Sequence, residues 1–404
     1  MKVIGKVPPI LLYCLISLST LTETVYSAAL PEIARQLNTD GSIAQSSTSA
    51  YYVGFALGIF TLGRISDIYG RKPVVIFGIG FYIIATFLIS KSTNIEMFIL
   101  FRFTQAYGAS VGSVIAQAMA RDSYKGWELS YIYASVSTIM AFVPSIGSAL
   151  GGYIIEYFEQ WQYIFDFLIL LSTILLGIYI KFLPETNVYI GSTKNNRFFM
   201  VLKVALKDKT LLTYAFIVGM YNGICFGFYI QAPFIFIGRL EMSPSNYGKL
   251  FLALSVANLS GGLITRYLVR KFVSTLKIRV AGFILSAVGC IMLLIGSQID
   301  TDEATYVALL IFGPMAIHLM GHAMVVPMLL RHALEDYQKV TGSAGSIFGA
   351  MYYLMTAGVS FMISTFHSNT INNFAYLFAM LFSISLMLFY YSNTNNLKTR
   401  SAFL

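Results

Sequence analysis

The sequence has few charged residues and few cysteines, and both shortages limit what the protein can be. Charged residues make up 11% of the 404 residues, against about 25% in a typical soluble domain. The three cysteines lie inside apolar runs without the spacing of metal ligands, so neither a disulfide framework nor a metal site is expected. With four histidines, no phosphate-binding loop and no nucleophile arrangement in the sequence, we expect no enzyme and no cofactor. The cysteines are Cys14, Cys225 and Cys290.

Apolar residues are abundant instead, at 57% of the chain. A bilayer is the solvent that such a chain requires, and about 20 apolar residues cross it as a helix. The apolar runs therefore predict an all-α integral membrane protein with 12 transmembrane helices. The runs cover residues 8–29, 47–66, 73–91, 95–118, 131–153, 163–183, 210–236, 245–268, 277–298, 304–329, 341–364 and 371–391.

The lysines and arginines gather in alternate loops. With the N-terminus placed inside, 22 of the 27 fall on the inner side, four fall outside, and Arg102 alone lies within a helix. This bias predicts that both termini are cytoplasmic, and it explains the net charge of +9 without nucleic acid. The first run could be a cleaved signal peptide, but eleven spans would then remain and the alternation would be lost.

A polar, basic stretch at residues 184–209 separates six spans from six, which predicts bundles at residues 1–183 and 210–404 joined by a cytoplasmic linker loop. A weak internal repeat supports two pseudo-symmetric halves, although Arg266 stands in the second copy where the first has Asp67. In transporters built this way the substrate site lies between the halves at mid-membrane. The repeated residues are Gly63, Arg71 and Lys72, followed by Gly262, Arg270 and Lys271.

Three motifs resemble those of the major facilitator superfamily. The loop from Gly63 to Lys72 is similar to that family's signature between helices 2 and 3, and the residues from Leu100 to Gly108 are similar to its helix 4 motif. The third resembles the helix 5 motif typical of drug–proton antiporters, with Val143 where the usual motif has glycine. It comprises Pro144, Gly147, Gly151 and Gly152.

Further segments are similar to the bicyclomycin-resistance branch of multidrug efflux transporters. The resemblance spans the whole chain and implies the two-bundle major facilitator fold. The segments are Tyr26–Pro31, Ala120–Asp122, Trp161–Phe165, Leu183–Thr186 and Gly342–Ser346.

The acidic residue that this branch carries in helix 1 is displaced by one position. Thr24 occupies the expected place and Glu23 precedes it. Ionisable residues inside membrane spans are functional candidates, since a carboxyl group there can hold a proton and release it when water arrives. Glu23 is therefore our hypothesis for proton coupling, and a structural carboxylate is the alternative.

Arg102 is the basic residue deep in a span. Its guanidinium group stays charged, so it requires a partner or a water-filled cavity. The resemblance implies that this arginine influences a nearby carboxylate, for which Glu23 is the candidate, and a purely structural ion pair is the alternative. Gln105, three residues later, is expected on the same face.

The Gly63–Lys72 loop is implied to be a gate. Asp67 is expected to cap the N-terminus of helix 11 across the two halves, where the helix dipole favours a carboxylate. Arg71 is expected to pair with Asp122 at the end of helix 4. The alternative is that these charges only anchor the topology.

A cavity lined by aromatic residues is expected between the halves, because aromatic and methionine side chains suit varied amphiphilic ligands. His318 and His322 share one helix face, but the other ligands of a zinc site are missing from the sequence around them. Packing alone and a special role in antiport are both open for the helix 5 glycines. The expected cavity residues are Tyr26, Tyr52, Phe55, Gln105, Tyr221, Asn222, Phe226, His318 and His322.

These features predict a monomeric secondary transporter of a bacterial-type inner membrane that exports a small molecule, most simply a drug or toxic amphiphile, in exchange for protons. Export of an endogenous metabolite such as a siderophore is the alternative, and a non-transporting membrane sensor is an alternative of another class. The expected partners are the substrate, protons and the lipid bilayer.

Overall fold

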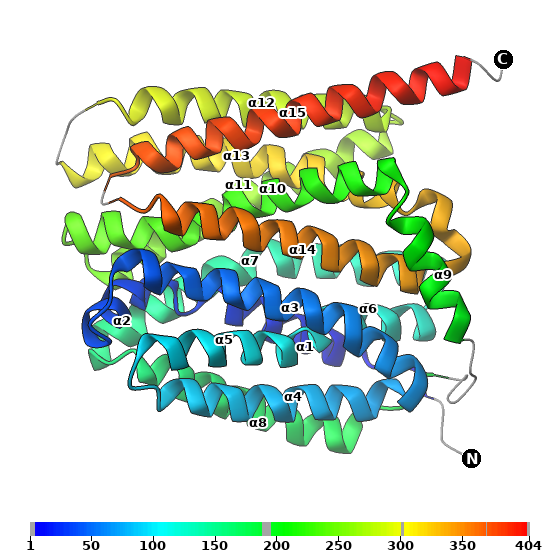
Figure 1. Ribbon diagram of the computed structural model, residues 1–404, viewed down its shortest axis with the longest axis horizontal. Coiled ribbons are helices and arrows are strands. Elements are labelled where there is room, and N and C mark those ends of the chain that lie inside the picture. The colour runs from blue at the N-terminus through cyan, green and yellow to red at the C-terminus, as the bar shows by residue number, and fades with distance from the viewer. Residues whose placement is uncertain (1–4, 188–194, 300–302, 369, 402–404) are drawn as a thin grey trace.

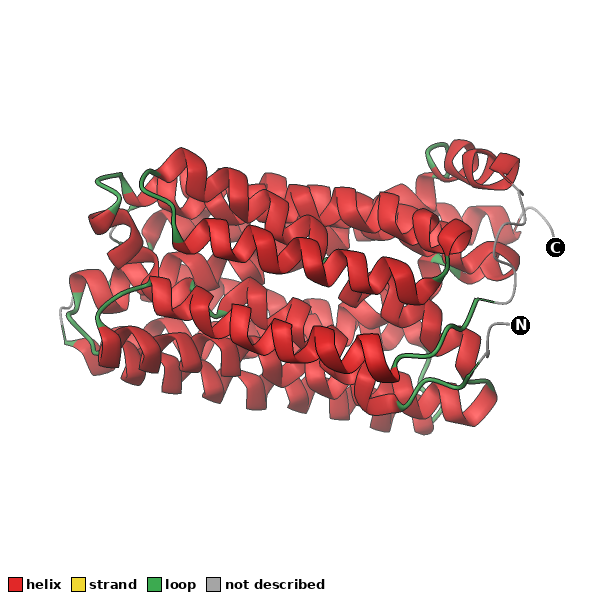
Figure 2. Ribbon diagram, turned by 90° about the horizontal axis from the view of Figure 1, so that it is seen from below, coloured by secondary structure: helices red, strands yellow, loops and turns green. Residues whose placement is uncertain are grey.

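A computed structural model describes residues 5–187, 195–299, 303–368 and 370–401 (Figure 1). These ranges are almost entirely helical, and no strand occurs within them (Figure 2). The reason is physical: in lipid, every backbone N–H and C=O must be paired within the protein, and a helix does this within one segment.

The N-terminal half is built from α1 to α8. Several of these helices are longer than the apolar runs, since they continue into polar residues at their ends. Their bounds are α1 Pro9–Thr24, η1 Ser27–Ala29, α2 Leu30–Gln36, α3 Gly41–Tyr69, α4 Arg71–Ser90, α5 Ile95–Ala109, α6 Val111–Ser123, α7 Gly126–Phe158 and α8 Gln162–Phe182.

A linker helix and the C-terminal half follow. Their bounds are α9 Asn195–Ala205, α10 Lys209–Pro233, η2 Phe234–Arg239, α11 Pro244–Arg270, α12 Thr275–Gly296, α13 Ala304–Ala333, η3 Glu335–Val340, α14 Thr341–Thr365 and α15 Asn372–Ser401.

Together these helices make the 12 crossings that the sequence predicts. Ten helical segments of the described ranges are long and apolar enough to span a membrane on those grounds alone. The other two crossings are α3, with 29 residues, and α5 continued by α6 after a break at Ser110. Both are less apolar because they lie against other helices, where small and polar residues are tolerated.

Local sequence explains several helix ends. The Asp208 side chain accepts hydrogen bonds from the backbone N–H groups of Thr210 and Leu211 at the start of α10, at 2.9 and 3.1 Å, as an N-cap residue does. Gly70 joins α3 to α4 with φ of 101°, a conformation that favours glycine. The charged loop between these helices is therefore a single sharp turn.

The two halves lie side by side, with α3 packed along α14 and α7 along α11 (Figure 1). Both chain ends lie at one end of the bundle, which we call the terminal side. It includes the turn at Gly70 and the start of α14, and the opposite end, with the turns near residues 38, 159 and 240, is the distal side. The interface between the halves is where a site reached from either side can form.

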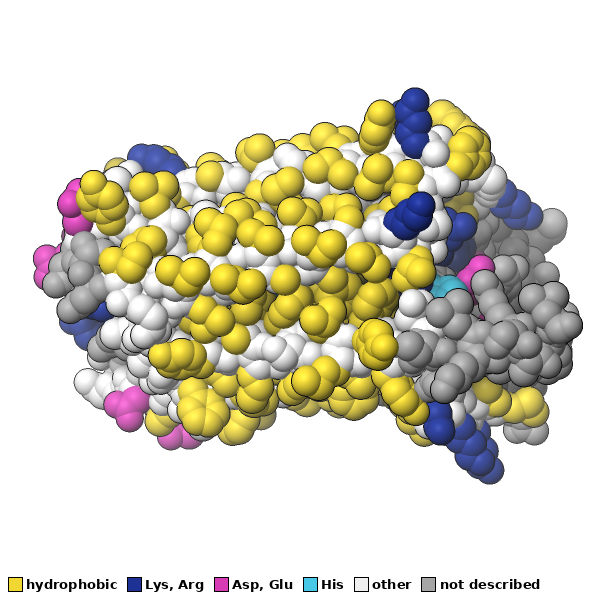
Figure 3. All heavy atoms as spheres, turned by 90° about the horizontal axis from the view of Figure 1, so that it is seen from above, with side chains coloured by type: hydrophobic (Ala, Val, Ile, Leu, Met, Phe, Trp, Pro, Cys, Tyr) yellow, Lys and Arg dark blue, Asp and Glu magenta, His cyan; other side chains and the backbone are white. Residues whose placement is uncertain are grey.

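The outer surface between these two ends is apolar (Figure 3). Large hydrophobic side chains such as Phe87, Leu170 and Leu309 are more than half exposed on it, whereas charged groups gather toward the ends. An exposed apolar surface of this extent is covered by lipid. This is the surface of a multi-pass membrane protein.

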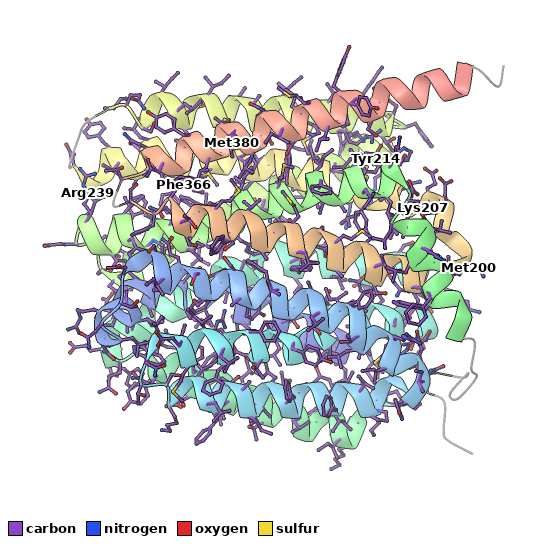
Figure 4. The ribbon with its side chains drawn as sticks, in the orientation of Figure 1. Met200, Lys207, Tyr214, Arg239, Phe366 and Met380 are labelled. Atoms are coloured by element: carbon purple, nitrogen blue, oxygen red, sulfur yellow. The ribbon has the colours of Figure 1, made fainter. Side chains whose placement is uncertain are left out.

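The predicted linker loop at 184–209 is partly wrong, because residues 195–205 form the helix α9. Phe198 of α9 packs edge-on against Phe60 of α3, with 5.5 Å between ring centroids. Apolar residues at helical spacing, which a loop does not need, explain the difference. Met200 of α9 and the nearby Lys207 lie at the terminal side, at the opposite end of the bundle from Arg239 and Phe366 at the distal side (Figure 4). Residues 188–194 of the predicted linker lie outside the described ranges.

Candidate functional site

A cavity of about 370 Å³ lies between the two halves. Its lining reaches from Glu23 and Tyr229 in the middle of the bundle to Gln117, Arg266 and Leu330 near the terminal side. Gln117 and Arg266 are exposed whereas Glu23 is 7% exposed, so the cavity opens toward the terminal side. Its volume falls within the range of about 300–1,000 Å³ found for small-molecule sites.

The distal side is closed by contacts between the halves. The Nε2 group of Gln45 on α3 lies 3.1 Å from the carbonyl oxygen of Ile230, 3.0 Å from Gln231 Oε1 and 3.0 Å from His367 Nδ1. These interactions join α3 to α10 and to the end of α14. The structure is therefore accessible from one side only.

A second distal contact joins α7 to α11. There the backbone N–H of Ser245 donates to Glu156 Oε2 at 2.7 Å. A carboxylate beside the first residues of α11 is favoured by the helix dipole, so this contact adds to the closure.

Glu23 lies at the deep end of the cavity, fourteen residues beyond the start of α1, or about 21 Å along the helix axis. Successive helix residues differ by about 100° in direction. Thr24 accordingly faces α7, next to Gly147, while Glu23 lines the cavity with Ser19 and Thr20. The structure thus brings the displaced carboxyl group, and not the residue at the expected position, to the cavity.

Arg102 is fully buried and does not line the cavity. The carbon of its guanidinium group lies 3.9 Å from the ring centroid of Tyr26 and 4.4 Å from that of Tyr51. Its Nη1 donates to Gln105 Oε1 at 2.5 Å. Arg102 and Glu23 form no direct ion pair among the described contacts, but their charges are close enough to interact electrostatically, so the influence of Arg102 on Glu23 stays a prediction. Two aromatic faces stabilise the cation.

Gln105 lies beside Arg102, as predicted, but it points away from the cavity. Its Nε2 donates to Thr86 Oγ1 at 2.9 Å. Thr22 and Tyr82 hydrogen bond to each other nearby at 2.8 Å. This buried network joins α1, α4 and α5, so Gln105 holds helices together and is not a wall of the cavity.

Four of the nine predicted cavity residues line it: Phe55, Asn222, Phe226 and His322. The other five are not in the lining, because each packs between helices behind the wall, and these are Tyr26, Tyr52, Gln105, Tyr221 and His318.

The prediction missed the aromatic pair Tyr352 and Tyr353 on α14, which also lines the cavity. Tyr353 lies 4.6 Å from Phe55 and 6.1 Å from Tyr52, measured between ring centroids, so it joins the halves. The sequence feature that could have identified them as cavity residues is the pair of adjacent tyrosines in an otherwise apolar helix.

At the terminal side, Arg71 Nε lies 3.3 Å from Asp122 Oδ2, as predicted. Asp67 forms an ion pair with the same arginine at 2.6 Å. Helix 11 of the sequence prediction is α14, the eleventh crossing. The expected capping of α14 by Asp67 is not found in the described residues, since α14 begins without a side-chain cap. Asp67 instead faces the first turn of α14, at Gly342 and Ser343, across a second cavity of about 220 Å³.

Glu185 fixes this loop in place, which the sequence did not suggest. Its Oε1 accepts from the backbone N–H of Arg71 at 2.9 Å and its Oε2 from that of Lys72 at 3.1 Å. The carboxylate therefore caps the N-terminus of α4. Thr186 Oγ1 donates to Asp122 Oδ2 at 3.1 Å, which ties the start of the linker to the same network.

The motif that resembles helix 5 of the family lies on α7 and forms two different contacts. Gly147 and Gly151 pack against Thr24 and Val25 within the N-terminal half, whereas Gly152 packs against Pro244 of α11 in the other half. Pro144 lines the cavity.

For metal binding, no group of three or more histidine, cysteine or acidic side chains is close enough in the described ranges.

Comparisons with known proteins agree with this architecture. Residues 12–360 match the family model described as Major Facilitator Superfamily. An uncharacterized transporter of Rickettsia bellii is 52% identical, covering 97% of this chain and 98% of the relative. A chloramphenicol resistance protein of Pseudomonas aeruginosa is 28% identical over 86% of this chain and 81% of its own.

A bicyclomycin resistance protein homolog of Haemophilus influenzae is 22% identical over 93% of both chains. Among solved structures, a D-xylose–proton symporter superposes with a TM-score of 0.74 at 13% identity, covering 94% of this chain and 96% of the other. At that identity the likeness concerns the fold alone.

Proposed function

The chain belongs to the Major Facilitator Superfamily, and from this premise we propose that it exports small amphiphilic molecules in exchange for protons, by alternating access of one central cavity. Membership of a family of transporters agrees with the prediction that the protein is not an enzyme. Two relatives are named for resistance to bicyclomycin and chloramphenicol, and these names support drug-like substrates.

Glu23 at the deep end of the cavity is the observation that carries the proposal. Of the described residues that line the cavity, it has the only acidic side chain. A carboxyl group there can exchange a proton with water from whichever side is open. Because the cavity is closed at the distal side, rocking of the halves around it would expose Glu23 to the two sides in turn.

The charge bias supports an orientation. The terminal side carries most lysines and arginines, so we assign it to the cytoplasm of a bacterial cell and the distal side to the outside. Both termini are then cytoplasmic, and the structure corresponds to the conformation that takes up substrate from the cell.

The cavity wall indicates the substrate class. Phe55, Phe226 and Tyr352 present aromatic surface, which suits flat or apolar ligands. The positive charge of Arg102 is shielded by Tyr26 and Tyr51, so the deep end offers Glu23 alone as a formal charge. Neutral and cationic molecules fit such a site better than anionic ones.

Transport by purified protein in liposomes tests the proposal. With an imposed pH gradient and no membrane potential, labelled chloramphenicol and ethidium should accumulate against their gradients and stop when the pH gradient is collapsed. Transport that ignores the pH gradient, or no transport of any compound in a broad panel, would overturn the proposal.

Replacing Asp67 by asparagine should stop transport without affecting expression. Asp67 is exposed, and surface ion pairs contribute only about 0–1 kcal/mol to stability. We expect its carboxylate to meet the uncapped first turn of α14 when the terminal side closes, and asparagine lacks the charge that the helix dipole favours.

Glu128→Gln is the matched control, because the Glu128 side chain is about as exposed as that of Asp67 and forms an ion pair with Lys6 at 2.9 Å near the same side. The rate of substrate uptake into inverted vesicles, normalised to the amount of protein, measures both variants. A normal rate for Asp67→Asn would contradict the gate.

External acid should favour opening of the distal side. Burial lowers the pKa of His367 below its ordinary value in this closed state, and solvation on opening would restore it. The open state therefore binds more protons, so acidification through the range just below the ordinary value of about 6.5 shifts the population toward opening, by at most about tenfold per pH unit.

The labelling rate of Ser145→Cys by an impermeant thiol reagent, in a background without the native cysteines, reports this opening. Ser145 lies buried beside Tyr229 at 3.2 Å. Comparing each rate with that of His367→Gln at the same pH cancels the reagent's own pH dependence. Equal pH profiles in the two backgrounds would contradict the role of His367.

A further inference from the structure

A cluster of polar side chains lies behind the cavity wall of the C-terminal half. Tyr221 of α10, Ser286 of α12 and His318 of α13 are completely buried there. The ring centroid of Tyr221 lies 5.5 Å from that of His318 and 6.3 Å from that of His322. His322, one turn after His318, reaches the cavity itself.

Several polar atoms of this cluster lack a hydrogen-bond partner among the described residues. They are both ring nitrogens of His318 and Nδ1 of His322. Tyr221 and Ser286 are close enough to interact with each other, but neither forms a well-aligned hydrogen bond. Buried polar groups are paired in nearly all native structures, and unpaired ones call for an explanation such as bound water, an ion or a functional role. The packing of an ordinary core does not provide one.

Asn222 determines which atom of His322 is available. Its Oδ1 lies 2.9 Å from His322 Nε2, and a carbonyl oxygen can only accept, so Nε2 carries the hydrogen. Nδ1 of the neutral ring then has a free lone pair. Histidine is the side chain whose charge changes most readily between about pH 5 and 8, so this nitrogen is a base directed into a polar cluster.

We propose that Nδ1 of His322 binds a second proton in each transport cycle, on the half of the protein opposite Glu23. This inference rests on the proposed exchange against protons. The proton arrives when the distal side is open, converts the neutral ring to imidazolium, and leaves through the cavity to the terminal side. His318, Tyr221 and Ser286 supply donors and acceptors for the water that carries it.

The surroundings make this second site depend on the first. An ionised Glu23 across the cavity attracts an imidazolium at His322, and a cationic or dipolar substrate between them competes with the proton at each. Substrate binding and proton release are thereby linked at both walls. Several titratable or charged groups face the two rings or share their cavity, and α15 contributes the apolar Phe378. These groups are Tyr221, Cys225 and Tyr229 of α10, Cys290 of α12, Tyr352 and Tyr353 of α14, Glu23 of α1 and Arg266 of α11.

Nuclear magnetic resonance of the full-length protein in lipid nanodiscs tests the site without any substrate. The chain has only four histidines, so ¹⁵N-labelled rings can be assigned with single variants. We expect a doubly protonated fraction of the His322 ring to appear as the pH is lowered. In Asn222→Asp the added carboxylate should keep it protonated at neutral pH. A ring that stays neutral throughout in both proteins would overturn the proposal.

The number of protons exchanged provides the second measurement. At zero membrane potential, each coupled proton supports about a tenfold chloramphenicol gradient per pH unit, so we expect about 100-fold for the native protein and about tenfold for His322→Gln. His332→Gln is the control, since His332 lies outside the cavity and pairs with Glu335 at 2.8 Å. An unchanged gradient for His322→Gln would refute the second proton.

The two measurements keep the two proposals separate. Protonation of His322 without any chloramphenicol transport would remove the proposed function but retain the proton site. Transport with a neutral His322 would do the reverse.

Discussion

The substrate gradient that a pH gradient supports should fall by about tenfold per pH unit or more when Glu23 is replaced by glutamine, while downhill exchange of substrate continues. Glutamine keeps the size and the hydrogen-bonding capacity of the side chain but cannot take up or release a proton. Glu23 lines the cavity at its deep end, where both sides would reach it in turn. Each proton that moves down the pH gradient supplies about 1.4 kcal/mol per pH unit. Without a titratable group at this position, that energy cannot drive transport through Glu23.

The measurement is the steady substrate gradient in liposomes at a fixed pH difference, together with exchange of labelled for unlabelled substrate. Glu23→Gln should reduce the gradient by about tenfold or more per pH unit and leave exchange within about twofold of the native rate.

The neighbouring variant Thr24→Val is the matched control. Thr24 Oγ1 is buried without a partner in the described residues, and valine has nearly the same shape, so coupling should be retained. A normal gradient in Glu23→Gln would remove Glu23 from the coupling mechanism.

The positions of the helices could be predicted because apolar length alone determines them. A run of about 20 apolar residues has no alternative to a helix in lipid, and all 12 runs correspond to crossings. Two features were beyond this argument. The break at Ser110 in the fourth crossing leaves the apolar run uninterrupted, so hydropathy does not reveal it. The helix α9 is short and amphipathic, so it resembles a polar linker in composition.

The site could be predicted only where one residue type decided the answer. A carboxyl group in helix 1 had to be functional or paired, but whether Glu23 or Thr24 faced the cavity depended on a 100° rotation that the sequence does not fix. The aromatic surroundings of Arg102 could not be predicted for another reason. Tyr26 and Tyr51 surround it, and they come from separate helices that only the fold brings together.

Replacing Gly152 by leucine should abolish transport by preventing closure of the distal side. A Cβ atom at this position would lie 2.9 Å from the carbonyl carbon of Pro244, across the interface between α7 and α11. That contact involves backbone, which cannot move aside as a flexible side chain can. The contact exists only while the distal side is closed, so the added side chain disfavours this state and tolerates the open one.

Two glycine variants separate this effect from misfolding. Gly151 is the adjacent residue, but a Cβ there would lie 2.9 Å from the carbonyl carbon of Val25 within the same half, so Gly151→Leu should lower folded yield in every conformation. Gly177 of α8 has open space around it, and Gly177→Leu should be nearly neutral.

Spin labels on the exposed Tyr157 of α7 and on Lys249 of α11, in a background without native cysteines, measure the distal opening. Gly152→Leu should fold normally, lengthen the distance between the labels, and reduce transport by about 100-fold or more, which corresponds to a penalty of about 2.7 kcal/mol or more on the closed state. A native distance distribution together with lost transport would mean that Gly152 acts within α7 itself. Native transport would mean that the two halves do not need this contact, and the distal closure would then depend on Gln45 and Glu156.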